Sequence, residues 1–255
     1  HLSLRRQRQM CIRDRNNNDE KELKEISFDI NYSKLESGAF DPNLYTIGQF
    51  TTTSISYSFI RELEGNLKRS SFSLGFQSGG GPDAIFNMAW VEVDLKLIIS
   101  KKLQTDIRFW MGNFLNNDNV PTHYRSFISG GVDPNFSNLI LDRTGSSENN
   151  SILNNQYIKS GPALKGLVKN NGVPISSTEM TWGLNFDPNL PFFIDIAGGS
   201  DFDEIFAVFG LKVGPMIIPL YQSWESENKL AKDVKWINER IRFTFSFDLS
   251  ELINF

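Results

Sequence analysis

The most constraining feature of the sequence is an alternation of apolar and polar residues that recurs in about ten segments. It is clearest near the end of the chain, in the stretch RIRFTFSFDLSELINF (240–255), where Phe243, Phe245 and Phe247 alternate with polar residues. Successive side chains of a β-strand point to opposite faces, so this period of two predicts a strand with one apolar and one polar face.

The same pattern predicts nine further strands and an all-β, antiparallel fold. The segments are 26–32, 47–59, 67–76, 91–99, 103–111, 180–186, 192–197, 205–213 and 216–220, the last interrupted by Pro219. A stretch rich in Asn, Ser and Gly, 113–176, predicts one long loop. We find no long amphipathic helical pattern in the sequence.

Alternation alone does not separate a soluble β-sandwich from a transmembrane β-barrel. The polar faces carry full charges, such as Glu92, Asp94 and Arg108, which would face water outside a sandwich or inside a wet lumen. Short joints tend to alternate with longer ones along the chain, and outer-membrane barrels show that asymmetry. Several segments also have the roughly 9–11 residues that cross a bilayer with tilt. We therefore predict a membrane barrel, with a secreted β-sandwich interaction module as the alternative.

The first segment, 1–15, differs from the rest. HLSLRRQRQMCIRDR is basic, has no period, and is similar to translated sequencing-adapter read-through in metagenomic assemblies, so we expect it to be foreign to the protein. Without its five Arg and one Asp the net charge falls from −4 to −8, which speaks against nucleic-acid binding. The segment also contains the one cysteine, Cys11. The rest of the chain, 16–255, then lacks thiol chemistry, and His123 alone cannot form a multi-histidine metal site. We expect no catalytic residue, no cofactor and no metal in it, and no enzyme activity of its own.

The terminal strand ending on the aromatic Phe255 resembles the closing strand of bacterial outer-membrane barrels. The wider pattern resembles the C-terminal part of sixteen-stranded barrels of the bacterial surface antigen superfamily. In those barrels a long extracellular loop enters the lumen with an aliphatic-Arg-Gly-aromatic motif, and five strands follow. Here five predicted strands follow Leu164-Lys165-Gly166-Leu167. By this resemblance Lys165 replaces the lumen-directed Arg, Gly166 is the Gly, and Leu167 replaces the aromatic. The alternative is that Lys165 and Gly166 form an ordinary turn.

That resemblance implies a truncated barrel holding about the last ten of sixteen strands, with a missing N-terminal region of the same parent. It also implies a bacterial outer-membrane location with a periplasmic C-terminus. The expected partners are outer-membrane lipid and the barrel-assembly machinery, and the expected activity is protein insertion or secretion.

A narrower resemblance concerns SGGVDPNF, LDRTG, NNQYIKSGPALKGL, PLYQSWE and KWINERIRFTFSFDLS. These stretches look similar to barrel regions attached to membrane alanyl aminopeptidases of the gluzincin type. The resemblance implies a membrane anchor or translocation barrel whose parent is a zinc metallopeptidase, with the zinc-binding His-Glu-x-x-His motif in the missing domain.

Two further features are structural candidates. Asp142 and Arg143 would form a salt bridge that orders the long loop, or a solvated turn pair of small net value. Trp182 has the parity of the apolar face in its strand, so we assign it to an interfacial aromatic belt.

Overall fold

The structure is a computed structural model that describes residues 8–15, 22–35, 46–62, 66–100, 103–128, 161–165, 167, 175–213, 216–222 and 242–243. Its strands are β1 (Arg8–Arg15), β2 (Glu22–Leu35), β3 (Gly48–Glu62), β4 (Leu67–Gly81), β5 (Ala84–Ser100), β6 (Leu103–Asp118), β7 (Ser126–Phe127), β8 (Ser176–Ser177), β9 (Thr181–Pro188), β10 (Phe192–Gly199), β11 (Phe206–Val213), β12 (Met216–Gln222) and β13 (Arg242–Phe243). The one described helical element is the short 3-10 helix η1 (Thr122–Tyr124).

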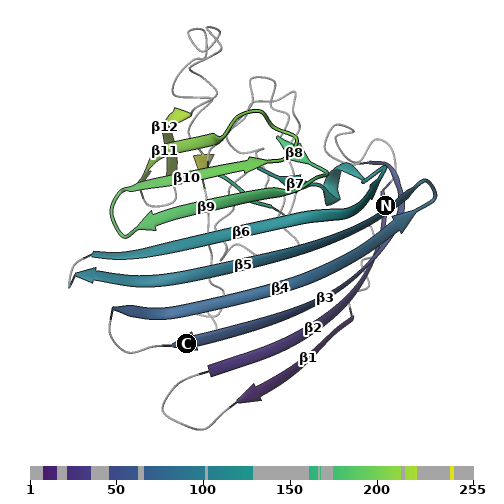
Figure 1. The fold of residues 1–255 in the computed structure, drawn as a ribbon, viewed down its shortest axis with the longest axis horizontal. Helices are drawn as coiled ribbons and strands as arrows, with labels where there is room; N and C mark the ends of the chain where they lie inside the picture. Colours follow the sequence, from purple (N-terminus) through teal and green to yellow (C-terminus); the bar gives the residue numbers. More distant parts are fainter. Residues whose placement is uncertain are drawn as a thin grey trace, which may run out of the picture.

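Eleven strands form one antiparallel sheet in the order β1-β2-β3-β4-β5-β6-β9-β10-β11-β12-β13. Figure 1 shows the long, curved strands side by side in chain order, from β1 at the bottom to β12 at the top. β7 and β8 pair separately, between β6 and β9 in the sequence. The prediction of an all-β, antiparallel fold is confirmed.

The described sheet is not closed into a barrel; we predicted a truncated barrel, and its place in a membrane stays a prediction. A barrel closes when its first and last strands pair, which removes both sheet edges. Within the described part of the chain β1 and β13 have one neighbour each, so the sheet is open. Most of the segment 240–255, including Phe255, lies outside the described residues, and only Arg242 and Phe243 of it pair with β12.

Ten of the eleven strands of this sheet lie in 16–255, and five follow the long loop. β1 lies in the segment 1–15 that we expected to be foreign, and it pairs with β2. β6 continues to Asp118, beyond residue 113 where we placed the start of the loop, and its Phe114 is buried. The glycine-rich stretch 78–86, which lies between two predicted strands, forms the end of β4, a turn at 82–83 and the start of β5. The glycines at its start belong to β4. A side chain at Gly81 would collide with the ring of Phe50, so glycine is required at that position.

One face of the sheet, which we call the outer face, is apolar and exposed. Residues directly opposite each other in antiparallel strands share a face, and one such row runs through Ile26, Tyr57, Leu74, Val91, Met111 and Trp182. Many large apolar side chains on this face are between 38% and 51% exposed, among them Ile26, Phe28, Ile30, Tyr32, Ile55, Phe72, Leu74, Phe76, Met111, Leu184, Ile194, Phe209 and Tyr221.

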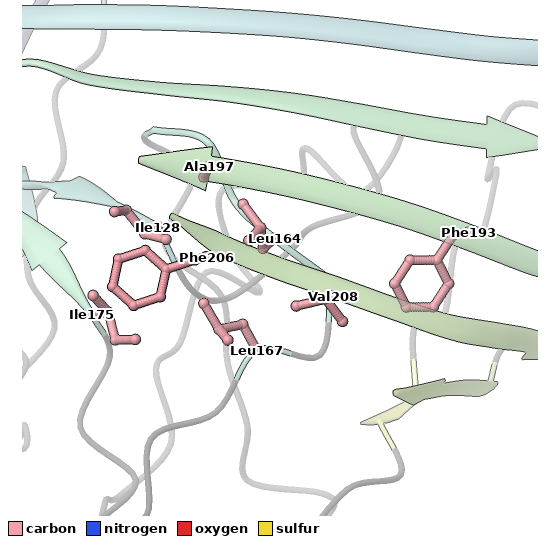
Figure 2. Packing of buried hydrophobic residues seen from close by; sticks show 8 residues of the cluster. All are labelled: Ile128, Leu164, Leu167, Ile175, Phe193, Ala197, Phe206 and Val208. Carbon is pink, nitrogen blue, oxygen red and sulfur yellow. The ribbon is translucent and has the colours of Figure 1, made fainter. Parts of the chain in front are cut away.

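The opposite, inner face carries the charges and also the buried clusters. One cluster covers β5 and β6 and consists of Phe86, Met88, Trp110, Phe114 and Val120. The other joins β10 and β11 to the long loop and consists of Ile128, Leu164, Leu167, Ile175, Phe193, Ala197, Phe206 and Val208. Figure 2 shows the side chains of this second cluster gathered between the strands and the loop segments. The structure therefore places buried clusters on the face that carries most of the charges, and it leaves the apolar face exposed.

Candidate functional site

The best-defined site is the place where part of the long loop packs on the inner face. We call residues 161–165 and 167 the docked segment. Its backbone is hydrogen-bonded to β7 and to the residue that follows β7. The Ala163 N–H donates to the Phe127 carbonyl at 3.1 Å, and the Leu164 N–H donates to the Ile128 carbonyl at 2.7 Å. The side chains of Leu164 and Leu167 enter the cluster on β10 and β11. Three parts of the loop, near residues 128, 164 and 175, thus meet on the same two strands (Figure 2).

Lys165, a sequence-predicted site residue, lies in this buried site and is only 8% exposed. Its backbone N–H donates to Oδ2 of Asp195 at 2.7 Å and its ammonium donates to Oδ1 at 3.2 Å. Asp195 is fully buried, on β10. The ammonium also lies 3.4 Å from Asp187 and over the ring of Phe193, 5.3 Å from its centroid. Two carboxylates and an aromatic face therefore surround one cation, which compensates its loss of water.

Asp187 extends this contact into a row of alternating charges. The ammonium of Lys212, on β11, donates to its Oδ1, while Lys165 approaches its Oδ2. The row therefore runs Lys212, Asp187, Lys165, Asp195 across three adjacent strands and the docked segment. Opposite charges in this order hold each other on the inner face without leaving an isolated buried ion.

A second cation, Arg108 on β6, holds the other end of the docked segment. Its Nη1 donates to the Pro162 carbonyl at 3.2 Å and its Nη2 to the Gly161 carbonyl at 3.4 Å. Its Nε donates to Glu92 and its Nη1 also reaches Asn185 at 3.2 Å. A guanidinium presents its donors in a fixed plane, which is why one side chain can join two strands and a loop.

The remaining predicted site residues fall into two groups. Trp182 lies on the outer face, opposite Met111 on β6, where its parity placed it. Asp142, Arg143, Gly166 and Phe255 lie outside the described residues. Among the residues that are described, no group of three or more His, Cys, Asp or Glu could hold a metal ion.

Sequence reasoning singled out Lys165 but missed its partner Asp195. The signal was available: FFIDIA (192–197) places one carboxylate at the centre of an otherwise apolar strand. A lone charge in such a strand is costly unless a cation meets it. The strand therefore predicts a cationic partner for Asp195 but does not identify it.

The fold and the site define an all-β chain with an exposed apolar face and an inner face on which paired charges hold a buried loop segment. Comparison with known protein families, curated proteins and solved structures found no match. None of the helical residues that the structure describes forms a helix long and apolar enough to span a membrane.

Proposed function

We propose that this chain is part of an outer-membrane β-barrel whose outer face contacts lipid. The observation that carries the proposal is that the exposed outer face of the sheet is apolar, whereas the inner face, on which the loop packs, carries paired charges. A soluble sheet that left Ile26, Phe28, Leu74 and Met111 exposed on one face would present a large apolar patch to water. In a bilayer the same face is solvated by lipid, and the backbone is satisfied from strand to strand.

The borders of the apolar face support this proposal. At one end of β2 the residues on the outer face are charged. Oε1 of Glu22 lies 3.5 Å from Nε of Arg61, and the ammonium of Lys24 lies over the ring of Phe59. On β3 and β4 the outer face becomes polar at the other end, with Thr53 opposite Ser78. A band of apolar residues between two polar borders matches the hydrocarbon layer between two headgroup regions.

The docked segment favours a barrel of the surface-antigen type within this class. By the sequence resemblance Lys165 would take the position of the lumen-directed cation in that superfamily. Its burial against the inner face and the five strands that follow it support this assignment. Protein insertion or secretion is the corresponding activity. The second candidate, a membrane anchor for a zinc aminopeptidase, rests on the sequence resemblance alone. Sequencing of the reading frame upstream of Asn16 would separate the two, because the peptidase needs a His-Glu-x-x-His motif there.

A secreted β-sandwich would require a second large sheet packed face to face on the first. The described strands supply one large sheet and the short β7–β8 pair. The membrane proposal therefore explains the exposed outer face without a partner sheet.

Neighbouring residues of β4 provide a direct test. Leu74 points outward and is 48% exposed, whereas Ser73 points inward. We expect Leu74→Arg to weaken folding into lipid vesicles by about 2–4 kcal/mol, and Ser73→Arg to weaken it much less. Urea titration of vesicle-inserted protein measures both changes. In a soluble protein an exposed Leu74 would tolerate Arg, so equal, small effects of the two variants would refute the proposal.

A further inference from the structure

Arg108 holds the docked segment through backbone atoms, independently of the segment's own side chains. The two bonds go to the carbonyls of Gly161 and Pro162, and both are acceptors whatever residues stand there. Lys165 holds the segment through its backbone N–H and also through its own ammonium, both of which donate to Asp195. The segment is thus fastened twice, to β6 at its start and to β10 near its end.

The start of the segment also fits the inner face by shape. A side chain at Gly183, on β9, would lie 2.5 Å from Cβ of Pro162, so the proline occupies the notch that this glycine leaves. Gly161 has a φ of +101°, and a side chain there would lie 2.5 Å from the backbone of Phe127. The close packing at Gly161 and Pro162 and the two bonds from the guanidinium to their carbonyls together restrict where these residues lie on the inner face.

Arg108 also has partners within the sheet, which do not depend on the docked segment. Glu92 on β5 and Asn185 on β9 are its partners within the sheet, one on each neighbouring strand. Its Nη1 and Nη2 groups also donate to the carbonyls of Pro162 and Gly161 in the docked segment. A guanidinium oriented in this way loses little conformational freedom when it binds two carbonyls.

We propose that Arg108 is the positioning residue of the docked segment, and that the Gly161-Pro162 joint with Gly183 sets where on the inner face the segment lies. The inference deepens the proposed function, because in the membrane this joint would hold the loop inside the barrel. Its contacts are internal to the chain, so they can be tested in detergent as well as in lipid.

The test measures how often the docked segment leaves the inner face. Leu164, which is fully buried, is replaced by cysteine in a Cys11→Ser background, and its reaction with a bulky maleimide is followed on the refolded full chain in detergent. We expect Arg108→Ala to accelerate labelling by about tenfold or more, because two charge-assisted bonds are lost. Arg108→Lys should remain fast, since an ammonium lacks the fork that reaches both carbonyls.

Gly183→Ala provides a second route that leaves every charge in place. Its added methyl group displaces Pro162, and labelling should again accelerate. Gly198→Ala is the matched control, because a side chain there faces Trp182 on the outer face at 3.1 Å, away from the docked segment. If Arg108→Ala does not refold, Gly183→Ala decides the question.

The inference is overturned if the refolded Arg108→Ala or Gly183→Ala chain labels at the parental rate, or if Arg108→Lys restores that rate. Urea midpoints measured in parallel show whether any acceleration is merely global unfolding, which would also overturn it. A cysteine in place of the outer-face Ile194 tests the proposed function separately: it should be protected in vesicles and reactive in mild denaturant. Reactivity of that cysteine in vesicles would refute the membrane proposal and leave the detergent result on Leu164 intact.

Discussion

Replacement of Asp195 by Asn should destabilise the chain more than any other single neutralisation on the inner face. Asp195 is fully buried and receives two bonds from Lys165, at 2.7 and 3.2 Å. Removal of one partner of a buried ion pair typically costs about 3–5 kcal/mol, because the other charge stays buried. Lys165 keeps Asp187 at 3.4 Å, so we expect a loss near the lower end, about 3 kcal/mol.

Equilibrium unfolding by urea, followed by tryptophan fluorescence of the detergent-refolded chain, measures this loss. Asp106→Asn is the matched control, since Asp106 has the inner parity on β6 but is exposed. We expect a change within about 0.5 kcal/mol for it, as for most surface substitutions. The double variant Asp195→Asn, Lys165→Gln should cost clearly less than the sum of the single variants, because each removes the same interaction. Equal effects of Asp195→Asn and Asp106→Asn would refute the buried pair.

Three further results are expected. Gly75→Val should cost about 1–3 kcal/mol in the same urea assay, because a side chain there would lie 2.5 Å from the Trp90 ring; an unchanged midpoint would contradict this packing. Burial lowers the pKa of His123 from 6.5 to about 4, so its contribution to stability is complete above pH 6.5 and is lost as the pH falls towards 4, by up to about 3 kcal/mol. His123→Phe should abolish that part of the pH dependence, and an unaltered pH profile would exclude His123 as its source. In vesicles of brominated lipid, Trp182 should be quenched and Trp90 should not; the reverse would invert our assignment of the faces.

The strand pattern of the large sheet could be predicted from the sequence because most of its strands have one apolar and one polar face. The predicted segment 91–99 lies inside β5, and 192–197 lies inside β10. An alternation with a period of two residues predicts both that a strand exists and which of its residues lie on the same face. It placed Trp182 correctly on the apolar face for the same reason.

Strand ends were less predictable because they depend on cross-strand contacts. β4 runs through three glycines to Gly81, and local propensity reads such a run as a loop. The neighbouring rings decide otherwise: Phe86 fills the space above Gly79 and Phe50 the space beside Gly81. Glycine in a strand often marks a place where a bulky neighbour needs room, but the neighbour cannot be identified before the register is known.

The charge pairs of the site were unpredictable for a different reason. Lys165 and Asp195 are separated by thirty positions, and Arg108 is more than fifty positions from Pro162. Spacing along the chain carries no information about such contacts. Lys165 could be selected only by its resemblance to a known motif, and Arg108 was recognised only as one of several charges on a polar face.

The inner face itself shows where the loop docks. On β2 to β4 many of its residues are small and polar, such as Ser27 and Ser56, whose Oγ atoms lie 2.6 Å apart. On β11 the same face carries Phe206 and Val208, both buried, while the outer face carries Phe209. A strand that is apolar on both faces is covered on both faces. The apolar run FAVFGL (206–211) thus marks a strand that lipid would cover on one side and the docked segment covers on the other. A strand in which the alternation fails is therefore a candidate for a strand whose inner face is covered by a loop, as β11 is.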